Sequence, residues 1–238
     1  MNFLSRYIEG ECEAVYKEIF SLGDKAFDPI LFPEINSVLK ETFERVKFNL
    51  DIIYAELDSI GYIFAEPACY NGRKPITPPE PNTEVLLQQL KYHLGAAAEI
   101  PLSLQYFYKV AGSCNFCWNY ESNDDIPWEG ADPLDMPALK DLIEMYENAE
   151  PETDYDGKDL LLAGDSLTKD NISGSTYNIK IHSKQTIDTI LLHEDWNIPF
   201  IEYLRITFNN CGFSMADSCQ YESLRAFCAK VRPLLRPI

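Results

Sequence analysis

Three groups of residues have the types and spacing that could support chemistry. Cys114 and Cys117 stand three positions apart, which is the spacing of half a zinc site or of a redox pair. A structural zinc site needs two more ligands, and Cys211 and Cys219 are eight residues apart and offer no matching turn. A redox pair usually begins a helix, whereas this one follows the expected helix end at Gly112. We therefore expect core or partly exposed thiols, and neither a metal site nor a cofactor.

The other two groups depart from the patterns that their chemistry requires. The segment from Asp154 to Asp165 has Gly at its fourth position and Asp at its twelfth, whereas a calcium loop needs Gly at the sixth and Glu at the twelfth. Ser166 and Lys169 have the spacing found in penicillin-recognising enzymes, but the further motifs of those enzymes are missing. The sequence thus offers no catalytic constellation, and we expect a protein that is not an enzyme.

Two other functions stay open from the residues alone. One is hydrolysis by dispersed acids, for instance Asp165 and Asp170, which a deep pocket with two facing carboxylates would favour. A flat acidic face would instead favour binding. The other is a structural or small-ligand role for the concave face of a sheet, and its candidate residues are Tyr177, Arg205 and Phe213.

Apolar periodicity predicts the elements that must position these residues. A first helix is expected over 4–20 with a stop near Gly23, and a second follows Pro33 and ends before Gly61. Five prolines within 67–82 indicate a loop or a linker. Further helices are expected over 83–94, 101–111, 139–146, 200–208 and 224–231, and strands over 159–163, 175–181 and 186–192.

Helices at both ends with strands between them indicate an α+β fold. We expect an N-terminal helical extension (1–66), a proline-rich linker or loop (67–82) and an α+β core (83–238), packed as one unit. No run of about 18 apolar residues occurs, so no contact with a membrane is expected. Glutamates interrupt the first twenty residues where a signal peptide would be apolar, and seven irregularly spaced cysteines fit reduced thiols. These features indicate a cytoplasmic protein.

The chain is acidic, and its acidity is concentrated in one stretch. The 20 Lys and Arg against 38 Asp and Glu give a net charge of −18, which argues against nucleic-acid binding. From Glu121 to Asp159, fourteen acids are opposed only by Lys140 and Lys158, which leaves −12 in this stretch. Such a field attracts basic proteins. A solvated face that keeps the protein soluble, or a face that binds cations, would have the same composition.

Trp118 and Trp128 lie at this acidic stretch, and an aromatic side chain flanked by carboxylates can anchor a protein partner. Burial of the loop that carries them is the alternative. The predicted partner-binding face consists of Trp118, Glu121, Asp124, Asp125, Trp128, Glu129, Asp132 and Asp135.

Four segments resemble a known family. IPLSLQYFYKVAGSCNF (100–116) resembles the Leu/Ile-Pro-x-Ser-Leu-x-x-Phe-Tyr…Gly stretch of the SUKH superfamily, the relatives of the Smi/Knr regulators of cell-wall synthesis. Asp132-Pro133-Leu134, DLLLAGDSLTKDNISGSTYNI (159–179) and PFIEYLRITFNNCGF (199–213) look like the later blocks of a bacterial SUKH-like group. Two positions depart from the pattern, since Ser175 and Cys211 stand where glycines are expected. The first 60 residues lie outside the resemblance.

The resemblance implies a fold and a class of partner. The fold would be α+β, with a bent, largely antiparallel sheet flanked by helices and no catalytic residues. Many bacterial members are immunity proteins that neutralise secreted toxins, often nucleases, whose active surfaces are basic. We therefore expect a non-enzymatic, acidic, cytoplasmic binding protein that neutralises a basic toxin or acts as a regulatory scaffold. The hydrolase and the small-ligand-binding domain are the alternatives.

Overall fold

The computed structural model shows an α+β protein, as predicted, and describes residues 2–65, 75–120, 128–148, 159–192 and 197–238. Its α-helices are α1 (Phe3–Ile8), α2 (Cys12–Ser21), α3 (Phe32–Ser59), α4 (Thr83–Leu94), α5 (Leu102–Tyr106), α6 (Leu139–Glu147), α7 (Ser166–Lys169), α8 (Phe200–Asn209) and α9 (Glu222–Val231). Its strands are β1 (Ile76–Thr77), β2 (Ser113–Asn115), β3 (Asp135–Met136), β4 (Asp159–Gly164), β5 (Thr176–Lys180), β6 (Ile190–Leu192) and β7 (Asn197–Pro199). Short 3₁₀ turns η1 (Gly23–Phe27), η3 (Ala216–Ser218) and η4 (Arg232–Leu234) and the π-helix η2 (Phe107–Ala111) complete it.

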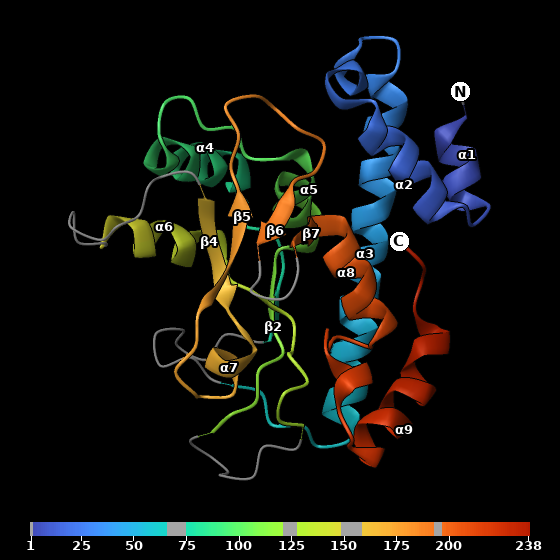
Figure 1. Ribbon diagram of the computed structural model, residues 1–238, viewed down its shortest axis with the longest axis vertical. Coiled ribbons are helices and arrows are strands. Elements are labelled where there is room, and N and C mark those ends of the chain that lie inside the picture. The colour runs from blue at the N-terminus through green and yellow to red at the C-terminus, as the bar shows by residue number, and fades with distance from the viewer. Residues whose placement is uncertain (1, 66–74, 121–127, 149–158, 193–196) are drawn as a thin grey trace.

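Helix α3 is the longest helix in the described part of the chain. It has 28 residues and is therefore about 42 Å long. In Figure 1 it runs along the long axis, with α1 and α2 beside one end and α9 beside the other. Its buried stripe includes Ile35, Leu39, Val46, Ile53 and Leu57, at the spacing predicted for the second helix. The stripe contacts both the N-terminal helices and the elements of the core.

The N-terminus holds two helices where one was predicted. Gly10 has φ +106°, a conformation that side chains with a Cβ rarely adopt, and it separates α1 from α2. The apolar spacing of Leu4, Val15 and Ile19 does not reveal this break. Both short helices bury an apolar face against the rest of the protein, so the apolar spacing in the sequence continues across the turn between them.

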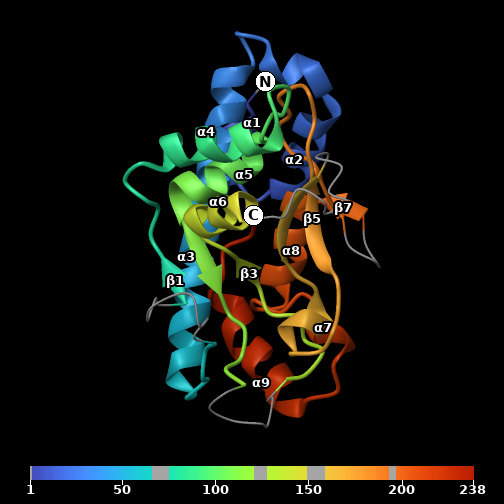
Figure 2. The same ribbon diagram turned by 90° about the vertical axis from the view of Figure 1, so that its left-hand side faces the viewer.

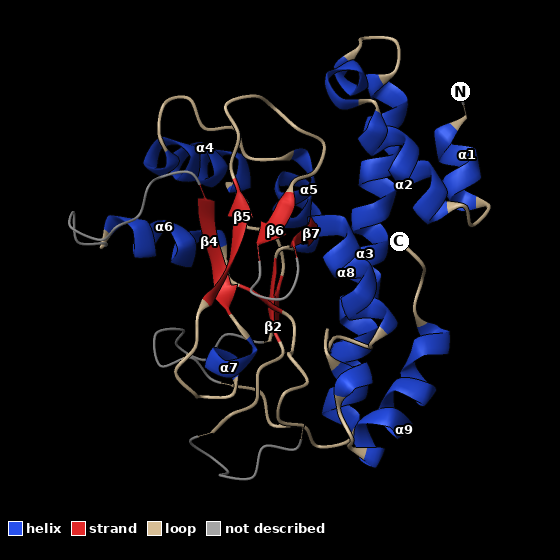
Figure 3. Ribbon diagram, in the orientation of Figure 1, coloured by secondary structure: helices blue, strands red, loops and turns tan. Residues whose placement is uncertain are grey.

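The strands form two antiparallel sheets, and Figure 3 shows them between α6 on one side and α8 with α3 on the other. One sheet has the order β1-β2-β3 and the other has the order β4-β5-β6-β7. In the larger sheet Leu160 pairs with Ile179, and a bulge lies between Leu161 and Ala163. The described end of the proline-rich segment supplies β1, so this part of the predicted linker belongs to a sheet.

The stretch from Pro101 to Gly112 is the helix predicted there, but it changes form within its length. It begins as α5 and continues as the π-helix η2, a form that is frequent at functional sites. Gly112 ends it with φ +91°, and an added Cβ there would lie 2.1 Å from the carbonyl oxygen of Thr77. In Figure 2 helices α4, α5 and α6 gather on one side of the molecule, and η2 leads from them to β2.

Apolar side chains from both sheets and from most helices form one continuous buried core. The predicted strand over 186–192 is shorter than expected, because only Ile190–Leu192 pairs with β5 while Asp188 and Thr189 face inward from a loop. Over the five described ranges, no helix is both long enough and apolar enough to cross a bilayer.

Candidate functional site

Asp132, one of the predicted partner-binding residues, lies in the interior. Its carboxylate accepts a hydrogen bond from Lys169 Nζ at 2.6 Å, and the two side chains are only 1% and 2% exposed. The hydroxyls of Tyr177 (2.8 Å) and Ser214 donate to its second oxygen. Asp132 therefore cannot belong to an exposed docking face, and the structure corrects that prediction.

Electrostatics fixes the protonation of this buried cluster, which consists of Asp132, Lys169, Tyr177 and Ser214. Burial by itself lowers the pKa of Lys169, but the adjacent charge of Asp132 outweighs it, and the pKa of Lys169 is raised. Burial and the same carboxylate both raise the pKa of Tyr177. Lys169 also lies 4.5 Å from the centre of the Tyr177 ring. Lys169 is thus charged and Tyr177 is neutral at neutral pH.

The buried cluster connects two of the segments quoted from the sequence with Ser214, the residue that follows a third. Asp132 has φ +55° and lies beside Pro133, which forms an isolated bridge with Phe213. Ser214 N donates to the Asp132 carbonyl at 2.9 Å. Lys169 and Tyr177 come from the 159–179 segment. The cluster's geometry is that of a structural joint, because each polar group finds its partner inside the protein.

Both tryptophans are also interior. Trp118 is 7% exposed and Trp128 is 6% exposed, and their rings pack against Tyr62 at 5.1 and 5.6 Å between centroids. Trp128 Nε1 donates to Ser223 Oγ at 3.0 Å. The alternative considered in the sequence, burial of the loop, applies to these two residues, which are not surface anchors here.

The remaining predicted acids divide into three sets. Glu121, Asp124 and Asp125 lie outside the described residues, as does Asp154 of the acidic turn. Glu129 is exposed. Asp135 is partly buried on β3. Burial raises its pKa, the nearby charge of Lys169 lowers it, and the net pKa is about 6.

The proposed groove of Tyr177, Arg205 and Phe213 is not formed. Tyr177 and Phe213 are 2% and 1% exposed and belong to the core. Arg205 lies on α8, where it donates to Glu202 and to the Ile238 carbonyl oxygen at 2.9 and 2.7 Å. Within the part of the chain that is described, these three side chains line no common cleft.

The two acids of the hydrolase alternative hold backbone groups. Asp165 caps α7 by accepting from Thr168 N at 2.8 Å, and it also accepts from Ser175 N at 2.6 Å. Asp170 accepts from Gly130 N at 2.7 Å. Both carboxylates therefore bind backbone N–H groups, and the hydrolase alternative stays a prediction.

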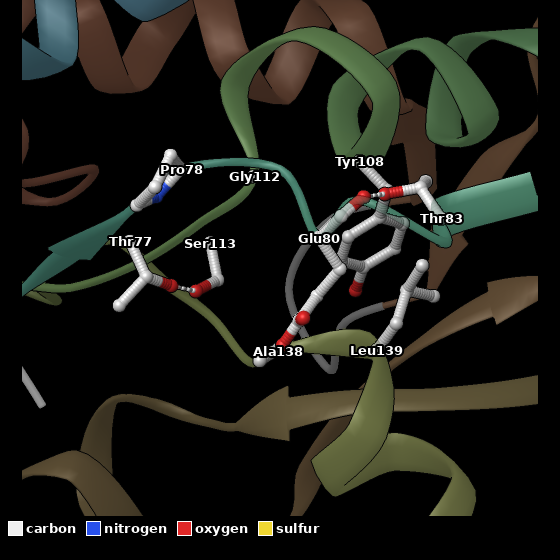
Figure 4. A pocket seen from close by; sticks show the side chains of 9 residues that line it. All are labelled: Thr77, Pro78, Glu80, Thr83, Tyr108, Gly112, Ser113, Ala138 and Leu139. Atoms are coloured by element: carbon white, nitrogen blue, oxygen red, sulfur yellow. Dashed lines mark hydrogen bonds between the residues drawn. The ribbon is translucent and has the colours of Figure 1, made fainter. Parts of the chain in front are cut away.

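Figure 4 shows a pocket of about 130 Å³ where η2 meets β1, β2 and α6. Hydroxyls line it: Thr77 and Ser113 are hydrogen-bonded to each other, and the Tyr108 ring enters between Glu80 and Leu139. This pocket can hold a small polar group, and Glu80, its one lining carboxylate among the described residues, is already paired with Lys140 at 2.8 Å.

The cysteine pair is buried, and burial raises the pKa of both the Cys114 and Cys117 thiols. Across the described ranges, no group of three His, Cys, Asp or Glu side chains is arranged to hold a metal ion. Their surroundings are those of inert core thiols.

Asp188 is another buried carboxyl group, and it is not among the residues predicted from the sequence. It accepts from Ser103 Oγ at 2.7 Å and from Ile201 N at 3.1 Å, and thereby joins α5, the loop before β6 and α8. Burial raises the pKa of Asp188, these hydrogen bonds lower it, and the net pKa is about 6. Ser103 is the serine of the quoted Pro-x-Ser-Leu stretch, and that motif was the available signal.

Comparison with known proteins adds no assignment, since no family model, no curated protein and no solved structure matches the chain.

Proposed function

We propose that this protein is a non-enzymatic binding protein that holds a basic protein partner on an acidic face. The observation that carries the proposal is that the acids between 121 and 159 differ in burial. Asp132 forms an ion pair in the interior, whereas Glu144 and Glu147 lie exposed on α6. We define the acidic face as Asp141, Glu144 and Glu147, which all lie on this one helix.

The acidic face has little opposing charge. Lys140, the single lysine of α6, is engaged by Glu80 of another segment at 2.8 Å. His93 of α4 approaches Glu147 at 3.6 Å and carries a charge only when protonated. Met145 is 41% exposed between the acids and supplies an apolar contact. A face that combines carboxylates with a flexible apolar side chain suits a basic protein surface, whose approach it would accelerate at low salt.

The partner class follows from the resemblance to the SUKH superfamily, whose bacterial members include immunity proteins against toxins. We propose a secreted toxin with a basic active surface, such as a nuclease, as the partner. A regulatory scaffold that binds a basic cellular protein is the alternative, and it uses the same face.

The test combines rescue with charge reversal. Each toxin gene that neighbours the gene for this chain is expressed with the wild-type protein, with E144K/E147K, or with D51K/D58K. The last variant makes the same charge change at two exposed positions of α3. We expect the wild type and D51K/D58K to rescue growth and E144K/E147K to fail, with a dissociation constant that rises steeply with NaCl. Absence of rescue from all of these toxins would contradict toxin neutralisation, and equal weakening by both variants would contradict the assignment to α6.

A further inference from the structure

The C-terminal segment has the opposite charge from the rest of the molecule. Residues 222–238 contain four Lys and Arg and a single acid, Glu222, in a chain whose net charge is −18. Part of this charge lines a cleft of about 390 Å³ between the α1–α2 turn, the end of α8 and the tail that follows η4. Figure 1 shows that tail returning from α9 to α8. Three arginines, Arg205, Arg232 and Arg236, are among the residues that line the cleft.

Arg236 is held in place without being neutralised. The Asn49 side chain makes two hydrogen bonds to the backbone of Arg236. It accepts one from Arg236 N at 2.8 Å and donates one to the Arg236 carbonyl oxygen at 2.9 Å. The guanidinium lies 3.8 Å from the centre of the Phe48 ring. Among the described residues this guanidinium makes no hydrogen bond and no ion pair, so all its donors remain available to a ligand.

Arg205 and Arg232 are also incompletely satisfied. The Arg205 side chain is nine-tenths buried, and its Nη2 has no hydrogen-bond acceptor in the described part of the chain. Arg232 donates through Nε to the Asn209 carbonyl oxygen. Its nearest carboxylate, Asp217, is 4.0 Å away and 82% exposed. A buried donor without an acceptor is costly, and this cost applies to Arg205 Nη2, whereas the exposed donors of Arg232 and Arg236 are open to solvent and to a ligand.

Ile238 also lines the cleft, and its main-chain oxygen accepts a hydrogen bond from Arg205 Nε at 2.7 Å, so an anion in the cleft would be held mainly by Arg232 and Arg236. The acidic side chains near the cleft have partners of their own. Glu13 lines it but is paired with Lys17, and Glu202 is bound to Arg205 Nη1 at 2.9 Å. Several cations elsewhere in this acidic chain have close carboxylate partners, as Lys169 and Arg6 do. Three arginines line this one cleft, and no carboxylate lies closer than 4.0 Å to Arg232 among the described ion pairs.

We propose that this cleft binds a small phosphate monoester. The planar forks of Arg232 and Arg236 would hold the phosphate oxygens, because guanidinium donors match that geometry in pairs. The organic part would rest on Phe208 and Leu235, which line the same cleft. The volume lies within the range of small-ligand sites and exceeds what a lone phosphate requires. This site is separate from α6, so the proposal does not depend on the proposed function.

Isothermal titration of the full chain with 5′-AMP and glucose 6-phosphate tests the proposal, with adenosine and glucose as phosphate-free controls. R232Q and R236Q change exposed side chains, and circular dichroism would verify their fold. R225Q is the matched control, because Arg225 is an exposed arginine of α9 that does not line this cleft.

We expect at least one phosphomonoester to bind and neither control compound to do so. R232Q and R236Q should each weaken binding by about tenfold or more, as expected for the loss of charge-assisted hydrogen bonds, while R225Q should change it by less than about twofold. The proposal is overturned if neither phosphomonoester binds, if adenosine binds as well as 5′-AMP, or if R225Q weakens binding as much as R236Q does.

Discussion

Charged and ionisable side chains in the interior of this protein act as connectors between segments that are far apart in the sequence. Asp132 joins the loop before β3 to α7, β5 and Ser214, and Asp188 joins α5 to α8. A carboxylate accepts several hydrogen bonds, and this allows one side chain to fix several strands and turns. The sequence shows that such residues are acidic, but it does not show that they are buried, because their side-chain partners lie far away along the chain, from 37 positions for Lys169 to 85 for Ser103.

The ion pair between Asp132 and Lys169 gives a direct test of this role. K169M leaves Asp132 buried without its cation, and we expect the free energy of unfolding, measured by urea denaturation, to fall by about 3–5 kcal/mol. The control K184M removes an exposed pair with Asp24 and should leave stability unchanged. The double variant D132N/K169M should be more stable than K169M. A K169M protein as stable as K184M would show that the pair is not a structural joint.

Asp188 predicts a pH dependence of stability. Its pKa is about 6 in the folded protein against 3.8 for the ordinary side chain, so the folded state favours the protonated form. That contribution is fully present below pH 3.8 and is lost as the pH rises to about 6. Compared with D188N, the wild type should lose up to about 3 kcal/mol between pH 4 and pH 6. Urea denaturation of both proteins across this range measures it, and parallel pH profiles would contradict the assignment.

At the scale of elements, long helices were predictable and short strands were not. The stripe of α3 extends over many turns, and such a repeat identifies a helix whatever surrounds it. Strands β1, β2, β3 and β7 have two or three residues each, too few to show an alternation. Their pairing comes from tertiary contacts, as does the burial of Trp128. The part of the acidic stretch before Pro137 was therefore expected to be a loop, although Asp135–Met136 forms β3.

Gly112, where η2 meets β2, is the clearest position at which one element depends on another. G112A adds a Cβ that would lie 2.1 Å from the Thr77 carbonyl oxygen, and it also strains φ at +91°. G95A is the matched control, because Gly95 has φ +109° and open space around its Cβ. Both should destabilise through strain, and G112A should cost about 1–3 kcal/mol more because of the clash. Equal unfolding midpoints of the two variants in urea would mean that β1 moves away from the added Cβ with no loss of stability.

Over the whole molecule, charge is distributed unevenly. The acids are concentrated between 121 and 159, whereas the C-terminal segment is basic. Like charges crowded on one side repel one another in the compact state, and the unfolded chain relieves that repulsion. The same asymmetry is the physical basis of both proposals, the acidic face on α6 for a basic protein and the arginine cleft for an anion.

Salt should therefore stabilise the protein. Raising NaCl from about 0.01 M to about 0.15 M shortens the screening length from about 30 Å to about 8 Å, and the urea midpoint should rise as repulsion is screened. E144K/E147K changes the net charge from −18 to −14 within the acidic stretch, and D51K/D58K makes the same change on α3. If the repulsion is local to the acidic stretch, E144K/E147K reduces the rise more than D51K/D58K does. A midpoint that falls with salt, or equal slopes for the two variants, would show that the acidity is not a concentrated field and would remove the electrostatic basis for assigning the partner to α6.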